Sequence, residues 1–213
     1  MCSHSNVTMG IYQSYLLPRI VNFACGLSPM MKQREKIVPL AEGRVLEIGI
    51  GSGLNLPFYT PGRIQLLWGL DPSQEMWALS HGKTGMTGLN VEFIEASAEH
   101  IPLDDGSADT VLTTYTLCTI PDVHSALVEV RRVLKPDGNL LFCEHGQAPD
   151  EKVRRWQNRV NPLWKRIGGG CNLNRPITQL IEQAGFVVRD MNTMYLPGWK
   201  PASFNCWGTA TKH

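Results

Sequence analysis

The sequence predicts an α/β fold, in which a mostly parallel sheet carries helices on both faces. Short apolar runs of strand length alternate with longer amphipathic stretches that suit helices along most of the chain. A glycine-rich turn follows the first apolar run, within residues 44–55, as is common where a strand leads into a helix. The length of 213 residues suits a single domain with a sizeable buried core.

The composition argues against several classes of function. A net charge of +1 gives no overall field that would favour nucleic acid. The six cysteines are scattered and none forms a C-x-x-C pair, so their spacing predicts neither a metal site nor a redox dithiol. We expect reduced cysteines and a cytoplasmic protein, because the first residues lack a signal-peptide pattern. No apolar run approaches the ~20 residues of a spanning helix.

The stretch at residues 44–55 reads R-V-L-E-I-G-I-G-S-G-L-N and predicts a ligand-binding corner. Its apolar start is typical of a strand buried on both faces. Three glycines follow at alternate positions: Gly49, Gly51 and Gly53. Such a turn lets a ligand approach the main chain without meeting a Cβ atom. A short helix is expected to begin at residues 54–55, which adds a helix N-terminus to the corner.

The glycine spacing indicates which ligand the corner binds. A dinucleotide fingerprint would need glycine at position 54, which is Leu54, and no Gly-Lys-Ser/Thr follows as in a P-loop. What remains is E-x-G-x-G-x-G, and the carboxylate of Glu47 would repel phosphates but attract a cation. S-adenosylmethionine carries an ammonium and a sulfonium group and no phosphate. The stretch therefore resembles motif I of the class I S-adenosylmethionine-dependent methyltransferases, although a glycine turn without a ligand is the alternative.

Two predicted helices precede this strand. Residues 9–27 are apolar-rich at helical spacing, and Ser28-Pro29 is expected to open a second helix that runs to about residue 40. The resemblance implies that residues 1–40 form a lid over the substrate pocket of a domain at residues 41–213. A plain cover for the sheet is an equal alternative. An interfacial membrane helix is disfavoured because Lys and Arg are scarce before Lys32.

The next strands supply the other expected cofactor contacts. The second strand, residues 64–70, ends at Asp71, where a carboxylate can bond both ribose hydroxyls. The alternative is that Asp71 caps a helix at residues 73–83. The third strand, residues 91–96, leads into A-S-A-E, which resembles the family segment that meets the adenine. The fourth strand, residues 109–116, should line the methionine moiety and the methyl group at its end, unless its hydroxyls serve only the sheet.

The resemblance implies a set of cofactor-binding residues, each carried over by its place in a motif. They are Glu47, Gly49, Gly51, Gly53, Asn55, Asp71, Pro72, Ser97, Ala98, Thr114 and Leu117. Ser97 stands where the family usually has Asp, and its hydroxyl can still accept a hydrogen bond.

The second half of the chain predicts the rest of the sheet. An amphipathic helix at residues 121–134 and a turn lead into a fifth strand at residues 139–143, which ends at Glu144-His145. A basic helix with two tryptophans covers residues 152–166, and its charged stems could cover a pocket, touch an acidic membrane surface or simply face solvent. After a further helix, strands at residues 187–194 and 203–210 fit the antiparallel edge hairpin of the class I methyltransferase fold. The resemblance thus implies a Rossmann-like, seven-stranded sheet with an antiparallel last strand.

Several late segments carry a finer resemblance. They are L-P-F-Y at residues 56–59, F-C-E-H at 142–145, N-P-L-W-K at 161–165, G-C-N-L-N-R at 170–175 and W-G-T-A at 207–210. Together they resemble the methyltransferase-like-seven group, which methylates alkyl thiols and whose eukaryotic members carry an N-terminal membrane anchor that we do not expect here. Weaker similarity runs to quinone C-methyltransferases and to lipid N-methyltransferases, and a protein that binds the cofactor without catalysis is the non-enzyme alternative.

The expected reaction is an in-line displacement in which the protein aligns nucleophile, methyl group and leaving sulfur. A small apolar thiol needs little more, because a thiol pKa near 8.5 leaves some thiolate at neutral pH. His145 is the best-placed weak base, although it could instead bond the backbone. Three cysteines near the site are interpreted as packing residues: Cys118, Cys143 and Cys171.

Overall fold

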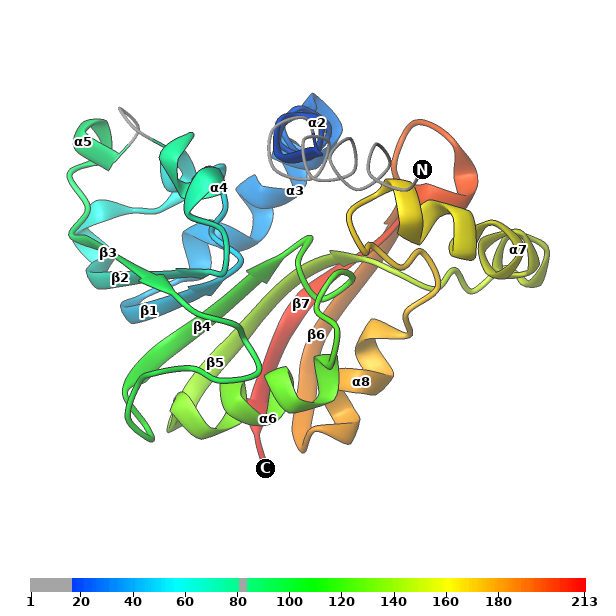
Figure 1. Cartoon of the computed structure of the whole chain (residues 1–213). Coiled ribbons are helices and arrows are strands. Elements are labelled where there is room, and N and C mark those ends of the chain that lie inside the picture. Colours follow the sequence, from blue (N-terminus) through cyan, green and yellow to red (C-terminus); the bar gives the residue numbers. More distant parts are fainter. Residues whose placement is uncertain (1–16, 81–83) are drawn as a thin grey trace, which may run out of the picture.

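The computed structural model describes residues 17–80 and 84–213, and these form a seven-stranded sheet flanked by helices (Figure 1). The strand order is β3-β2-β1-β4-β5-β7-β6. Neighbouring strands pair in parallel from β3 to β5, whereas β7 is antiparallel to both β5 and β6. The strands are β1 (Gly43–Ile48), β2 (Ile64–Asp71), β3 (Val91–Glu95), β4 (Ala108–Thr114), β5 (Leu134–His145), β6 (Phe186–Tyr195) and β7 (Phe204–Lys212). This confirms the predicted fold class, including the antiparallel last strand.

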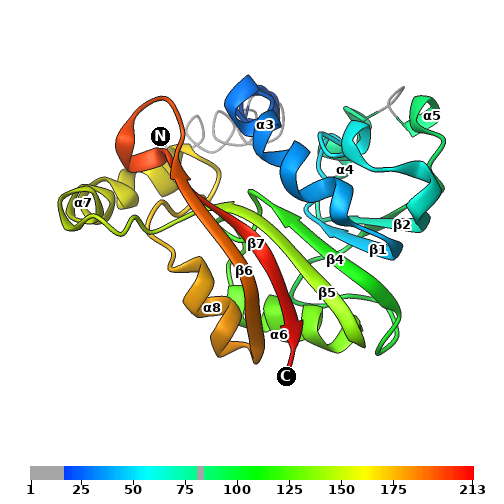
Figure 2. The same cartoon turned by 180° about the vertical axis from the view of Figure 1, so that it is seen from behind.

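Helices cover both faces of the sheet (Figures 1 and 2). The α-helices are α2 (Leu17–Cys25), α3 (Ser28–Ile37), α4 (Gln74–Ala78), α5 (Thr84–Thr87), α6 (Val123–Val133), α7 (Glu151–Ile167) and α8 (Ile177–Gln183). Short 3₁₀ turns occupy Val38–Leu40, Leu56–Phe58, Pro61–Arg63 and Lys200–Ala202. None of the described helices combines the length and the apolar character that a membrane span requires.

Two apolar clusters make the core, one on each face of the sheet. One face packs α6 and α8 against the strands, with Leu127 and Ile181 fully buried. The other face packs the end of α3 against the strands, with Ile37 and Val45 buried. Because successive strand residues face opposite sides, β1 sends Val45 to one cluster and Leu46 to the other. The first strand is therefore buried on both faces, as predicted.

The glycine corner departs from the prediction in one respect. The predicted helix at residues 54–55 is absent, and the chain runs through a turn into the 3₁₀ segment Leu56–Phe58. Gly53 adopts a left-handed φ of 69°, and Pro57 falls in the first turn of the 3₁₀ segment. These two residues allow a tight turn rather than a longer helix.

Two other elements differ clearly from their predicted bounds, and most remaining ends shift by one or two residues. The helix expected at residues 73–83 ends at Ala78, where backbone bonds from the next two residues close the last turn, and residues 81–83 lie outside the described part. The strand expected at residues 139–143 begins already at Leu134, because the chain rejoins β4 there with an irregular register. The sequence K-P-D-G at residues 135–138 is thus an interruption within β5 rather than a separate turn.

The N-terminal helices lie beside the edge where β1 and β2 end (Figure 2). The predicted helix at residues 9–27 is confirmed over Leu17–Cys25, and residues 9–16 lie outside the described part. The second predicted helix is confirmed as α3 with Pro29 in its first turn, followed by the 3₁₀ segment Val38–Leu40. Asn22 of α2 bonds Ser52 in the glycine turn. The N-terminal helices therefore cover the turn, while their role as a lid stays a prediction.

Candidate active site

The glycine turn folds back over the carboxyl ends of β2 and β4. Its first amides donate to the carbonyl of Leu70, from Gly49 at 2.7 Å and from Ile50 at 3.2 Å. Gly49 has a φ of 72°, and a Cβ atom there would lie 2.4 Å from the side chain of Thr116. Only glycine fits this position, because both the backbone conformation and the neighbouring side chain exclude a larger residue.

Asp71 closes the second side of the turn. One carboxylate oxygen accepts from the amide of Gly51 at 3.0 Å, and the other accepts from the amide of Ser73 at 2.9 Å. The N-cap of α4 is Ser73, whose hydroxyl accepts from Met76, so the helix does not use Asp71 for that purpose. Burial raises the pKa of Asp71, and the two amide bonds oppose this. A carboxylate has about four acceptor sites, so two remain for hydroxyls of a ligand.

Glu47 lies at the centre of a buried polar network beneath the turn. Its two oxygens accept from Asn55 Nδ2 at 2.9 Å and from the Tyr59 hydroxyl at 2.6 Å. The side chain is 1% exposed. Burial raises the pKa of Glu47 to about 7, against the opposing effect of the bonds from Tyr59 and Asn55 and of the nearby charge of Arg34. A cationic group of a ligand would stabilise the ionised form.

Arg34 of α3 reaches into the same network, and the sequence did not single it out. Its Nη1 donates to Oδ1 of Asn55 at 2.7 Å and to Oγ1 of Thr114 at 2.5 Å. The guanidinium lies 5.2 Å from the centroid of the Tyr115 ring. Arg34 is buried, with 4% of its surface exposed. Its Nε nevertheless has no hydrogen-bond partner among the described residues. A buried donor without a partner suits an anionic group of a ligand.

The predicted adenine-side residues follow the end of β3. Asp71 pairs with Glu95 in the sheet, so the residues after β3 lie beside those after β2. Ala98 is buried, whereas Pro72 and Ser97 are exposed. The Ser97 hydroxyl bonds Glu99. The structure thus places this edge next to Asp71, with the hydroxyl of Ser97 already engaged.

The end of β4 makes a sharp bend that the buried Glu144 holds. Tyr115 has a φ of 56°, which is uncommon for a residue with a Cβ atom. Glu144 of β5 then accepts from the amides of Thr116 at 3.0 Å and of Leu117 at 3.2 Å. Burial raises the pKa of Glu144 to about 7, and the two amide bonds oppose this. Thr114, just before the bend, joins the Arg34 network, whereas Glu144 holds the residues just after the bend to β5.

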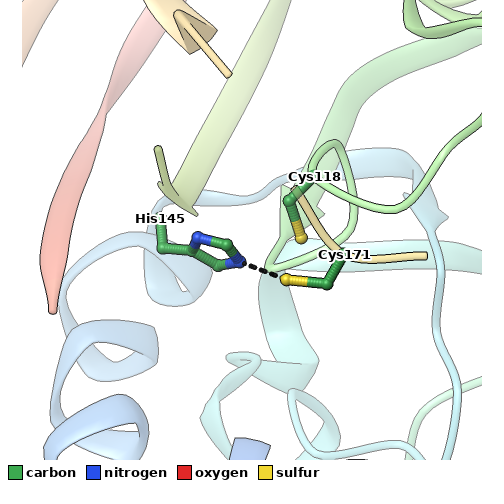
Figure 3. A group of neighbouring side chains, drawn as sticks. All are labelled: Cys118, His145 and Cys171. Carbon is green, nitrogen blue, oxygen red and sulfur yellow. Dashed lines mark hydrogen bonds between the residues drawn. The ribbon is translucent and has the colours of Figure 1, made fainter. Parts of the chain in front are cut away.

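Beyond this bend, three side chains from separate segments converge (Figure 3). Cys118 comes from the loop after β4, His145 from the end of β5, and Cys171 from the loop between α7 and α8. Their ligand-type atoms all lie within 4.8 Å of one another, and the distance from His145 Nε2 to Cys171 Sγ is 3.1 Å. We call these three residues the Cys–His cluster. The sequence predicted no metal site and interpreted both cysteines as packing residues, because their separation along the chain hides this proximity.

The charges in the Cys–His cluster are unusual. The Cys118 thiol lowers the pKa of Cys171 to about 4; burial opposes this, and the hydrogen bonds from His145 and Trp164 reinforce it. Burial lowers the pKa of His145, but the bond to Cys171 outweighs it, and the net pKa is raised. The bonds from His145 and Trp164 therefore favour the thiolate form of Cys171.

An apolar cavity of about 170 Å³ lies between the start of α3 and the loop that joins β6 to β7. Its walls include Leu27, Met30, Leu196 and Trp199. The rings of Trp199 and Trp164 lie 5.8 Å apart between centroids. Trp164 in turn donates from Nε1 to Cys171 at 3.2 Å. Two aromatic side chains therefore connect the cavity to the Cys–His cluster.

Comparisons with known proteins identify the family. The family described as "Methyltransferase domain" matches residues 46–142. Human thiol S-methyltransferase TMT1B is 37% identical over 180 residues, which cover 81% of this chain and 72% of that protein. The chain belongs to the class I S-adenosylmethionine-dependent methyltransferases. It is a methyltransferase whose domain implies the use of S-adenosylmethionine, as the glycine turn predicted.

Two further comparisons bear on the fold and on the range of relatives of this methyltransferase. Demethylmenaquinone methyltransferase from Thermus thermophilus is 31% identical over 175 residues, which cover 78% of this chain and 79% of that protein. The crystal structure of a methyltransferase from Thermotoga maritima, described as a possible histamine N-methyltransferase, superposes with a TM-score of 0.66 at 23% identity. That match covers 96% of this chain and 99% of the other and supports the fold alone.

The methyltransferase brings the predicted motif residues to one edge of its sheet. Glu47, Asn55 and Thr114 share one hydrogen-bond network, and Asp71 joins Gly51 directly. His145 lies apart from that network, against Cys171 rather than against the backbone. What sequence reasoning missed is Arg34 and the pairing of His145 with two cysteines. The G-C-N-L-N-R segment was the one signal that marked Cys171 in the sequence.

Proposed function

We propose that this methyltransferase transfers the methyl group of S-adenosylmethionine to the sulfur of a small, largely apolar thiol. The observation that carries the proposal is the 37% identity to human thiol S-methyltransferase TMT1B across 81% of the chain. The apolar cavity beside Trp199 agrees with an uncharged acceptor. The products would be the methyl thioether, S-adenosylhomocysteine and a proton.

The cofactor contacts are proposed from the geometry of the motif residues. Asp71 has free acceptor sites for both ribose hydroxyls, and the glycine turn leaves room for the main chain to meet the ligand. The adenine would lie beside the exposed Pro72 and Ser97, next to the buried Ala98. S-adenosylmethionine, when bound, supplies an electrophilic methyl group on a sulfonium.

The methionine end of the cofactor would lie over the Glu47 network. Glu47 and Asn55 would face the ammonium group, and Arg34, with its unpartnered Nε, would bind the carboxylate. Thr114 and Leu117 would line the carbon chain of the cofactor between its amino acid end and the sulfonium. This arrangement gives each charged group of the amino acid moiety a buried partner of opposite sign.

The acceptor would enter through the apolar cavity with its sulfur toward the Cys–His cluster. Positioning and exclusion of water are the main contributions of the protein to an in-line displacement. His145 would take the proton of the acceptor thiol, for which its Nε2 would have to leave Cys171. A neutral thioether product would have no charged partner there and would leave readily.

Two other reactions and one non-enzymatic role are the rivals. The 31% identity to a demethylmenaquinone methyltransferase keeps methylation of a quinone-precursor carbon as an alternative. Methylation of a lipid amine would require contact with a membrane surface. A silent cofactor-binding regulator would bind S-adenosylmethionine without turnover.

Mass spectrometry of products separates these possibilities. The protein is incubated with S-adenosylmethionine and a panel of alkyl thiols, amines, phenols, a demethylated quinol and phosphatidylethanolamine. We expect methyl thioethers from the thiols, and none with Asp71→Ala at low cofactor concentration. Methylated amine, carbon or phenol with untouched thiols would reject the thiol acceptor, and cofactor binding without any product would indicate the regulator.

A further inference from the structure

The Cys–His cluster has the donor set and the spacing of a soft-metal site. Cys118, His145 and Cys171 offer two sulfur atoms and one imidazole nitrogen, all within 4.8 Å of one another. In a tetrahedral zinc site, bond lengths of about 2.3 Å to sulfur and 2.0 Å to nitrogen place such donors roughly 3.5–3.8 Å apart. The distance from His145 Nε2 to Cys171 Sγ is 3.1 Å, and no two donor atoms of the cluster lie more than 4.8 Å apart. The expected donor separation falls between these two values.

The loops that carry the two cysteines are fastened to each other. The backbone amide and the side-chain amide of Asn172 both donate to the carbonyl of Cys118 at 2.9 Å. Arg175 donates to the carbonyl of Leu117. These bonds join the loop after β4 to the loop after α7 next to each sulfur, so the donors are held together before any ligand arrives. Such preorganisation is what a binding site requires and simple packing does not.

The surroundings of the sulfur atoms also resemble those of metal-bound thiolates. Trp164 Nε1 donates to Cys171 Sγ at 3.2 Å, which is an outer-shell hydrogen bond of the kind that orients a ligand. Cys118 is buried, whereas His145 and Cys171 are partly exposed. Two of the three donor residues are therefore partly accessible to solvent.

We propose that Cys118, His145 and Cys171 bind one Zn²⁺ ion through two thiolates and Nε2, with the fourth position open. Three protein ligands and one open position are the arrangement of catalytic zinc sites, whereas structural sites have four protein ligands. The soft sulfur donors select Zn²⁺ over Mg²⁺ or Ca²⁺. His145 would then act on the acceptor as a ligand of the metal.

The role of this ion rests on the proposed thiol acceptor. The acceptor thiol takes the open position, and its S–H proton leaves to water because the bound thiol is more acidic. An electron pair on that sulfur forms the new bond to the methyl carbon. The old carbon–sulfur bond breaks, and its electrons neutralise the sulfonium. One thiol and S-adenosylmethionine thus give one thioether, S-adenosylhomocysteine and one proton, and the ion returns unchanged.

Metal content tests the site without reference to activity. Protein purified under reducing conditions is dialysed against Zn²⁺ and desalted, and bound zinc is measured by mass spectrometry. We expect about one zinc per chain, and an at least tenfold lower affinity in Cys118→Ser, Cys171→Ser and His145→Gln. Cys206→Ala removes a buried thiol outside the cluster and should keep the metal. Circular dichroism confirms that each variant is folded.

Cobalt gives an independent spectroscopic readout. Co²⁺ in place of Zn²⁺ should show the sulfur charge-transfer absorption of thiolate ligands and the intense visible bands of a four-coordinate ion. Trp164→Phe removes the outer-shell bond, keeps an aromatic ring beside Trp199 and should weaken metal binding roughly tenfold. Its matched control is Trp156→Phe, since Trp156 lies on the same helix and is 58% exposed.

Adding an alkyl thiol to the Co²⁺ form tests the open position. A shift of the charge-transfer band at thiol concentrations that support turnover supports the proposed role. Zinc-free protein with full thiol methylation would overturn the role of the ion while leaving the proposed function intact. A disulfide between Cys118 and Cys171 in protein isolated without oxygen, or no binding of either metal, would overturn the site itself. Bound zinc together with methylation of amines alone would reject the thiol acceptor but keep the site.

Discussion

Arg34 of α3 donates a 2.5 Å hydrogen bond from Nη1 to Oγ1 of Thr114, at the end of β4. The bond joins two residues eighty positions apart and crosses from an N-terminal helix to the centre of the sheet. It places a permanent positive charge in a site that is otherwise built from acidic and neutral groups. The charge is buried, and its printed hydrogen bonds go to the neutral acceptors Asn55 and Thr114, so an anionic group of a ligand would stabilise it.

We expect Arg34→Met to weaken S-adenosylmethionine binding by about 1.5–3 kcal/mol, because a hydrogen bond to a charged group would be lost. Isothermal titration calorimetry measures the effect, and Arg34→Lys should restore part of it. Arg63→Met is the control, since Arg63 pairs with Glu42 at the surface. Equal affinities of wild type and Arg34→Met would remove Arg34 from the cofactor site.

The pairing of Gly51 with Asp71 gives a second expectation. A side chain at Gly51 would meet Met76 and approach the Asp71 carboxylate, and the φ of 49° disfavours valine there. Gly51→Val should therefore block cofactor binding, and Asp71→Ala should weaken it by about 1.5–3 kcal/mol. Micromolar binding to wild type is the reference. If calorimetry found both variants unchanged, the cofactor would have to bind elsewhere.

Cofactor affinity should depend on pH through Glu47. Burial raises its pKa to about 7, so the carboxyl group is ionised above that pH and protonated below it. The proposed partner is the ammonium group of the cofactor, which attracts only the ionised form. Affinity should fall as the pH drops below about 7, approaching tenfold per pH unit, and should level off above it.

A matched variant assigns this pH dependence. Glu47→Gln keeps the shape of the side chain and should bind weakly with a flat profile. Glu144 also has a pKa raised to about 7 and lies near the acceptor side. A Glu47→Gln profile as steep as that of wild type would transfer the effect to another group.

Deletion of residues 1–27 tests the predicted lid. The described part of this segment covers the glycine turn through Asn22 and Ser52, and Leu27 lines the apolar cavity. We expect the truncated protein to lose turnover and to keep much of its cofactor affinity. Thermal unfolding confirms that the remaining domain is folded. Full activity after truncation would show that the segment is a cover or a tether.

The exposed face of α7 predicts contact with an acidic membrane surface. Three large apolar side chains lie on it at helical spacing: Trp156, Leu163 and Ile167, which are 58%, 66% and 53% exposed. Six Lys and Arg residues share the helix. We expect sedimentation with anionic vesicles that salt weakens, and loss of it when the three apolar residues become serine. Val128→Ser on α6, 47% exposed, is the control, and vesicle binding of the triple variant equal to wild type would exclude this face.

The sequence was most informative where local chemistry decides the structure. The glycine turn, the acidic residue after β2 and the apolar strands follow from backbone sterics and burial, which act over a few residues. Arg34 was missed because an arginine on a polar helix resembles any solvated one until the helix packs on the sheet. The Cys–His cluster was missed for a related reason, since loop residues far apart in the chain meet only through the order of the strands.

The loop that walls the apolar cavity is closed at its base, where Tyr195 pairs with Phe204 and Leu196 donates to Ser203 at 2.8 Å. Among the described strands, this β6–β7 hairpin pairs with the rest of the sheet through β5 alone, and β4 separates β5 from β1, where the glycine turn begins. The loop can therefore vary in length at a small entropic cost, provided that Trp199 and Pro201 keep their contacts with α7. A library of variants could change this loop and keep β1, β2 and the glycine turn unchanged. Such variants would differ in the acceptors they take, while the methyl-donor site would stay the same.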